Sequence, residues 1–80
     1  MNTDIIIQLT EAEEARAFTE AAERFDSDID LLCGRYIVNA KSMLGVLSLV
    51  SDMPLTVRIH TEDMQEIDAF GAAMQRFVMK

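Results

Sequence analysis

Stretches with the period of a β-strand alternate along this chain with stretches that have the period of an α-helix, and their order limits the folds available to it. Leu55, Val57 and Ile59, for example, alternate with polar neighbours, which is typical of a strand with one solvated face. Strands are predicted at residues 4–9, 28–33, 36–39 and 55–60, and helices after Thr10, Ser42 and Thr61. The order β-α-β-β-α-β-α predicts an α+β fold, a four-stranded antiparallel sheet covered on one face by three helices.

Local signals at the ends of these segments support the assignment. Thr10-Glu11-Ala12-Glu13 has the spacing of a capping box, with an acid three residues after the capping threonine. Ser42 and Thr61 are predicted to cap the second and third helices, and residues 51–54 to end the second. Gly34-Arg35 fits a type II′ hairpin turn, since glycine tolerates the positive φ that the turn requires.

Length and charge exclude several classes of function. Eighty residues are expected to form a single domain, residues 1–80. The net charge is −7, from 14 acidic and 7 basic residues. This balance argues against a nucleic-acid or anionic-membrane surface, which needs clustered lysine and arginine. Proteins are the expected partners.

The single cysteine rules out an internal disulfide, and Cys33 and His60 are the only soft metal ligands, with no paired spacing. Neither a metal nor another cofactor is therefore expected. We find no signal-peptide pattern and no apolar run long enough to span a membrane, so the expected location is a reducing cytoplasm.

The segment 43–50 is almost wholly apolar, and four of its residues would share one helical face: Met43, Val46, Leu47 and Val50. Leu44 and Leu49 flank that face, and only Gly45 and Ser48 lie opposite. This arc is far wider than the ~100° stripe with which a surface helix covers a core. The surplus predicts an uncovered docking surface; the alternative is that every one of these residues belongs to the core.

The order of elements, together with the segments "FDSDI" and "KSMLGVLSL", resembles HPr, the small phosphocarrier of the bacterial sugar phosphotransferase system. Residues 20–80 can be laid on the HPr pattern without a gap. Lys41 through Leu49 match its motif K-S-[IL]-[ML]-G-[VL]-[ML]-S-L throughout, and Asn39 agrees as well. The resemblance implies an HPr-like open-faced β-sandwich. A ferredoxin-like fold, which shares the first six elements, is the alternative.

The resemblance ends where the family carries phosphate. HPr carriers have a Gly-[Ile/Leu]-His-Ala-Arg-Pro-Ala motif at the start of the first helix, and this chain reads Leu9-Thr10-Glu11-Ala12-Glu13-Glu14-Ala15 there. The phosphate-accepting histidine falls on Glu11, and the arginine that steadies the phosphoryl group falls on Glu13. His60 lies at the end of the fourth strand, away from any helix start, and is expected to be a solvated strand-end residue. The chain is therefore expected to have no catalytic residues and not to be an enzyme.

Glu11 has two candidate roles in addition to marking the loss of the phosphate-accepting histidine. An acid in the first helical turn is favourable to the helix dipole, and it could also imitate a permanently phosphorylated histidine. The rival from another functional class is a phosphotransfer protein that uses Glu11, or another residue, as its acceptor. Three carboxylates at one helix start argue against it, because they repel a phosphoryl donor.

Ser42 corresponds to the regulatory serine that HPr kinase/phosphorylase phosphorylates in family members. The resemblance implies that Ser42 is a phosphorylation site with Lys41 as a local counter-charge; the simpler interpretation is a helix cap bonded to the N–H of Leu44 or Gly45. Met43, Leu44 and Leu47 correspond to the apolar patch through which HPr proteins bind partners. Lys41 is expected to belong to this partner-binding surface as well. Three further residues are expected to turn mostly inward: Val46, Leu49 and Val50.

Catabolite-repression HPr of bacilli similarly lacks the histidine and keeps the serine, and it acts only as a regulatory partner of a LacI-type repressor. This chain departs from it at Glu13, where the lost arginine normally helps to bind the phosphoserine and the repressor. The expected partners are HPr kinase/phosphorylase, a transcriptional regulator or components of the phosphotransferase system. A third possibility is a diverged domain that has lost both functions and serves an unknown partner.

Overall fold

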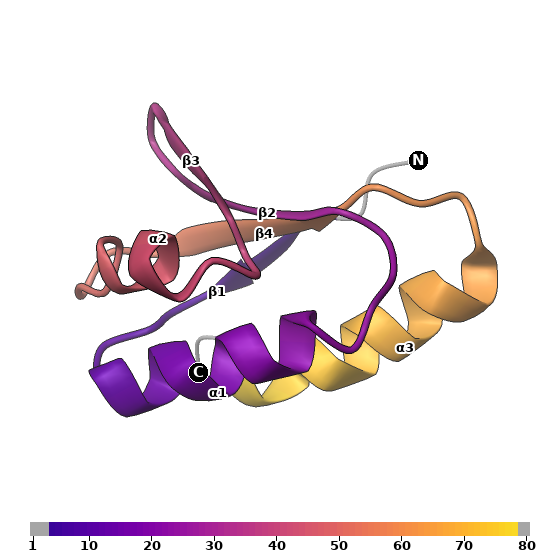
Figure 1. Ribbon diagram of the computed structural model, residues 1–80, viewed down its shortest axis with the longest axis horizontal. Coiled ribbons are helices and arrows are strands. Elements are labelled where there is room, and N and C mark those ends of the chain that lie inside the picture. Colours follow the sequence, from indigo (N-terminus) through magenta and orange to yellow (C-terminus); the bar gives the residue numbers. More distant parts are fainter. Residues whose placement is uncertain (1–3, 79–80) are drawn as a thin grey trace.

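The computed structural model describes residues 4–78 and contains the expected α+β architecture (Figure 1). Its strands and helices follow in this order: β1 (Ile5–Ile7), α1 (Ala12–Ala22), β2 (Ile29–Cys33), β3 (Tyr36–Asn39), α2 (Met43–Leu47), β4 (Leu55–Ile59) and α3 (Met64–Met74), with a 3-10 turn at Gln75–Phe77. The four strands form one antiparallel sheet in the order β1-β4-β2-β3. The predicted order of elements is confirmed.

The helices cover one face of this sheet, and α1 and α3 pack against each other along it (Figure 1). The strands direct their buried residues toward the helices, among them Leu31 and Val57, which pair across β2 and β4. Two edge-to-face ring pairs join α1 and its following loop to the C-terminal helical region: Phe18 with Phe77, centroids 5.6 Å apart, and Phe25 with Phe70, 5.8 Å apart. One continuous core results.

The β2–β3 hairpin turns as the sequence predicts. Gly34 has a φ of 57°, and no other described residue has a positive φ. A type II′ turn requires this combination, with glycine first and an ordinary residue second. The tip of the hairpin projects away from α1 and α3 (Figure 1) and is exposed.

The boundaries of β1 and α2 differ from those expected. β1 stops at Ile7, because the next N–H, that of Gln8, donates to the carbonyl of Phe77 at 3.0 Å instead of continuing the ladder. The short helix α2 ends at Leu47 rather than at residues 51–54, since the Ser48 hydroxyl donates to the Gly45 carbonyl at 2.6 Å and closes the last turn.

Two predicted caps are also wrong. Glu11, not Thr10, is the N-cap of α1, and its side chain makes no capping bond. Asp63, not Thr61, caps α3, accepting from the Gln65 N–H at 2.9 Å. The Thr61 hydroxyl, two residues before this cap, accepts from the Asp63 N–H at 3.1 Å. In each case the sequence contains several residues able to cap, and the path of the preceding loop selects among them.

Candidate functional site

The start of α1 carries exposed acidic side chains. Glu11 occupies the N-cap position with extended backbone, φ −136° and ψ 156°, and Glu13 follows in the first turn. Within residues 4–78, neither carboxylate forms an ion pair or a side-chain hydrogen bond. The positions that the resemblance assigns to the acceptor histidine and the arginine therefore present two unpaired negative charges to solvent.

Glu14 behaves differently from these two acids. Its Oε1 accepts from the Thr10 N–H at 2.9 Å and from the Thr10 hydroxyl at 2.7 Å. These bonds, the hydroxyl bond first and the N–H bond second, hold the pKa of the Glu14 carboxyl below its usual range. The predicted capping box used the neighbouring acid, Glu13; the structure replaces it with a contact over four residues.

Arg76 is the basic residue that lines a hollow together with Glu13 and Glu14, between α1 and the end of the C-terminal helical region. Its guanidinium carbon lies 5.2 Å from the centroid of the Phe77 ring. The two acids therefore share a hollow with one cation that also stacks on an aromatic ring.

Ser42 is exposed and caps α2, as predicted. Its Oγ accepts from the Gly45 N–H at 3.3 Å, and its carbonyl accepts from the Val46 N–H at 2.9 Å. Of the two expected hydroxyl partners, Leu44 and Gly45, the structure selects Gly45. The long bond and the exposed side chain leave the hydroxyl accessible to another protein.

The predicted docking residues divide by exposure. Leu44 is 83% exposed, whereas Met43 and Leu47 are half-buried and Leu47 packs against the core. Val46 is fully buried, and Leu49 and Val50 are half-buried against the core. Leu44 is therefore the most exposed residue of the apolar surface on α2, which we call the α2 patch (Met43, Leu44 and Leu47).

The helical pattern predicted that Gly45 would lie opposite the apolar face of α2. In the structure it faces β3 instead. A Cβ built there would lie 3.1 Å from Cβ of Val38, so α2 crosses β3 at close range at this position. The backbone contact fixes which side of α2 faces the sheet. It turns Leu44 outward.

Lys41 is half-buried, and its ammonium is directed to α1 rather than to Ser42. Nζ donates to the carbonyl of Phe25 at 2.5 Å, just beyond the C-terminal end of α1. Its own N–H donates to Asn39 Oδ1 at 2.9 Å, which closes the turn before Ser42. The counter-charge expected beside Ser42 is thus already bonded elsewhere in the fold.

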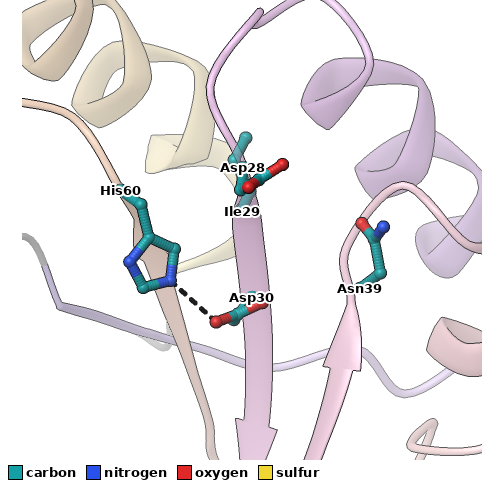
Figure 2. A pocket seen from close by; sticks show the side chains of 5 residues that line it. All are labelled: Asp28, Ile29, Asp30, Asn39 and His60. Carbon is teal, nitrogen blue, oxygen red and sulfur yellow. Dashed lines mark hydrogen bonds and ion pairs between the residues drawn. The ribbon is translucent and has the colours of Figure 1, made fainter.

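His60 lies just beyond β4 at an open hollow on the sheet, shared with residues of β2 and β3 (Figure 2). Its Nε2 is 2.7 Å from Asp30 Oδ2, so the predicted solvated side chain has a defined partner. Asp28 and Asn39 also line this hollow. β4 ends at the opposite side of the molecule from the start of α1 (Figure 1), which places the histidine far from the acidic cluster.

No group of three or more His, Cys, Asp and Glu side chains between residues 4 and 78 is arranged to hold a metal ion. No helix in the same segment is long and apolar enough to cross a membrane.

Comparison with known proteins decides the family. Residues 9–79 match the family model described as the PTS HPr component phosphorylation site. The chain belongs to the HPr family. Among HPr relatives, the phosphocarrier protein HPr of Treponema pallidum is 33% identical over 69 residues, which cover 86% of this chain and 78% of that protein.

Solved HPr-family structures have the same fold. HPr of Bacillus anthracis superposes with a TM-score of 0.67 at 29% identity, over 90% of this chain and 95% of that one. The Bacillus subtilis catabolite repression protein Crh superposes with a TM-score of 0.65 at 32% identity, over 92% and 88% of the two chains. HPr-C-His from Thermoanaerobacter tengcongensis, at 23% identity, supports the fold with a TM-score of 0.71 over 95% and 91%. The ferredoxin-like alternative is thereby excluded.

Three contacts near the candidate sites were not predicted from the sequence: Thr10 with Glu14, Lys41 with the Phe25 carbonyl, and Ser27 with Glu66. The last two join residues 16 and 39 positions apart. Only the first had a local signal, a threonine four residues before an acid. The others depend on how the loops pack.

Proposed function

We propose that this HPr-family protein is a regulatory binding protein that catalyses no reaction and carries no phosphate on histidine. The observation that carries the proposal is the start of α1, where Glu11 and Glu13 present unpaired carboxylates and no histidine is present. The sole histidine of the chain, His60, is paired with Asp30 beyond β4. Phosphoryl transfer to this helix start would need compensation of the phosphate charge, and the carboxylates there add negative charge instead.

The proposed regulation acts at Ser42. Its exposed hydroxyl begins a helix whose following residues, Met43 and Leu44, are apolar and accessible. A phosphate there would add about 1.5 to 2 negative charges at pH 7 beside the backbone N–H groups of the first turn. The cap bond to Gly45 is compatible with this role, because a phosphoserine keeps oxygen acceptors.

The α2 patch (Met43, Leu44 and Leu47) is the proposed partner-binding surface. At 83%, Leu44 is the most exposed of the large hydrophobic side chains among residues 4–78, and Met and Leu side chains at a surface suit adaptable docking. The proposed partners are cytoplasmic proteins: HPr kinase/phosphorylase, a transcriptional regulator or components of the phosphotransferase system. Lys41, which the sequence predicted as part of this surface, donates to the Phe25 carbonyl instead.

The first test separates this function from phosphotransfer on Glu11 or another acceptor. The protein is incubated with phosphoenolpyruvate and enzyme I of the phosphotransferase system, and its intact mass is measured, with HPr of Bacillus anthracis as the positive control. We expect the control to gain phosphate and this protein to gain none. Stoichiometric labelling of this protein would contradict the proposal.

The second test addresses Ser42. Incubation with HPr kinase/phosphorylase and ATP should add one phosphate to the wild-type chain and to Ser48→Ala, and none to Ser42→Ala. Ser48 is the matched control, since it is an exposed serine at the other end of α2. Labelling that survives Ser42→Ala, or no labelling of the wild-type chain, would leave Ser42 as a helix cap only.

A further inference from the structure

Lys41, the neighbour of Ser42 in sequence, contacts the loop that follows the C-terminal end of α1. Its ammonium donates to the Phe25 carbonyl at 2.5 Å, across 16 positions of sequence. This carbonyl belongs to the segment that leaves α1 and runs toward β2. The bond therefore braces the start of α2 against the α1–β2 loop.

The same loop is attached to α3 two residues later. The Ser27 hydroxyl donates to Glu66 Oε1 at 2.6 Å, and the Ser27 N–H donates to Oε2 at 3.3 Å. Glu66 lies in the first turn of α3. Hydrogen bonds from Ser27, and then from Thr61, hold the pKa of the Glu66 carboxyl below its usual range, and the positive charge of Lys41 adds to this lowering.

The Lys41–Phe25 bond and the Ser27–Glu66 bonds are made by the same short loop, in which a single residue separates Phe25 from Ser27. Lys41 is also the direct neighbour of Ser42, whose side chain is exposed. A dianionic phosphate on that side chain attracts an adjacent ammonium more strongly than a neutral carbonyl does, because both partners of the new contact are charged. The ammonium has a flexible four-carbon stem and can exchange one acceptor for the other.

We propose that Lys41 is a positioning residue that couples Ser42 to the Ser27–Glu66 contact. A negative charge at Ser42 withdraws the ammonium from the Phe25 carbonyl, which frees the α1–β2 loop and weakens its attachment to the start of α3. The coupling rests on the proposed regulation at Ser42 for its biological use. It extends the effect of that site beyond the α2 patch to a second surface, the hollow between the α1–β2 loop and α3.

The test is a double-mutant cycle that needs no kinase. Ser42→Asp, Lys41→Met and the combined variant are compared with the wild-type chain, and the Glu66 side-chain pKa and the Ser27 amide exchange rate are measured by NMR. Ser42→Asp should raise the Glu66 pKa and accelerate exchange at Ser27, because the cation has moved away. Lys41→Met should produce the same changes by itself, and adding Ser42→Asp to it should change little more.

A matched control isolates the position of the charge. Ser48→Asp adds the same charge at the other end of α2 and should leave both readouts as in the wild-type chain. Three further charged groups line the hollow beside Glu66 and are identical in every variant: Arg24, Asp26 and Asp63. Changes at Glu66 and Ser27 can then be attributed to Lys41.

Two results would overturn the coupling. One is an equal effect of Ser42→Asp with and without the Lys41 ammonium, which would mean that the charge acts directly through its field. The other is no effect of Ser42→Asp at all. Both are separate from the labelling experiment with HPr kinase/phosphorylase, so failure of the coupling and failure of the proposed function are distinguishable.

Discussion

The carboxylate of Glu14 accepts two hydrogen bonds from Thr10, one from its N–H at 2.9 Å and one from its hydroxyl at 2.7 Å. In the HPr motif this position is a proline, which has no side-chain acceptor. Here Glu14 is a third acid beside Glu11 and Glu13, and of the three its side chain is the one that forms hydrogen bonds within the fold. The start of α1 thereby has a structural role that does not involve phosphate.

We first predict that Glu14→Ala lowers the free energy of unfolding at pH 7, by about 1 kcal/mol or less, as expected for an exposed capping contact. The folded-state pKa of Glu14 is lowered, so its contribution is complete above the pKa of the unfolded chain and is lost as pH falls through the folded value. Urea unfolding at pH 7 and at about pH 3 should show the difference from wild type closing in acid. Glu13→Ala removes the same charge without the contact and should cost less; an equal cost would contradict the assignment.

A second prediction concerns restoration of phosphate acceptance. Glu11→His with Glu13→Arg returns the two side chains of the HPr motif but leaves Glu14 bonded at the same helix start. We expect this pair to accept phosphate from enzyme I weakly, and the triple variant with Glu14→Ala to accept it several-fold faster, because one adjacent negative charge is removed. Phosphohistidine formed per unit time is the measurement. Equal rates in the two variants would show that Glu14 does not oppose the donor.

A third prediction separates exposed from packed residues of the α2 patch. Leu44→Glu should abolish partner binding at a cost under ~1 kcal/mol, because Leu44 is 83% exposed. Leu47→Glu should destabilise the fold more, since Leu47 packs against the core and a buried carboxylate is costly. Urea unfolding and a pull-down with the kinase check both. Retained binding in folded Leu44→Glu would exclude this surface.

A fourth prediction tests the β2–β3 turn. Gly34→Ala should cost about 1 kcal/mol, because an L side chain is disfavoured at a φ of 57°. A Cβ there would meet nothing within 4 Å, so backbone strain is the only cost. Arg35→Ala, next in the same turn, should be nearly neutral in thermal unfolding. Similar costs for the two changes would argue against the type II′ geometry.

Periodicity and one motif were enough to predict the fold, because each strand and helix of this chain has its own pattern of buried residues. Leu55, Val57 and Ile59 alternate with polar neighbours and are buried in β4 as expected. The match of Lys41 through Leu49 to the HPr motif predicts Ser42 at the start of α2, where it is the N-cap. The ends of helices were less predictable, since Thr10 and Glu11, or Thr61 and Asp63, compete as caps within a few residues.

The sequence by itself determined which chemical groups are available: one histidine, acids at Glu11 and Glu13, and a serine before an apolar helix. Only the tertiary structure decided what each group contacts. Leu44 rather than Leu47 faces solvent, because Gly45 brings α2 close to Val38. The Lys41 ammonium reaches Phe25 instead of its neighbour Ser42, because folding brings a distant carbonyl within its reach. Such contacts depend on the distance between atoms in space, and spacing along the chain does not encode that distance.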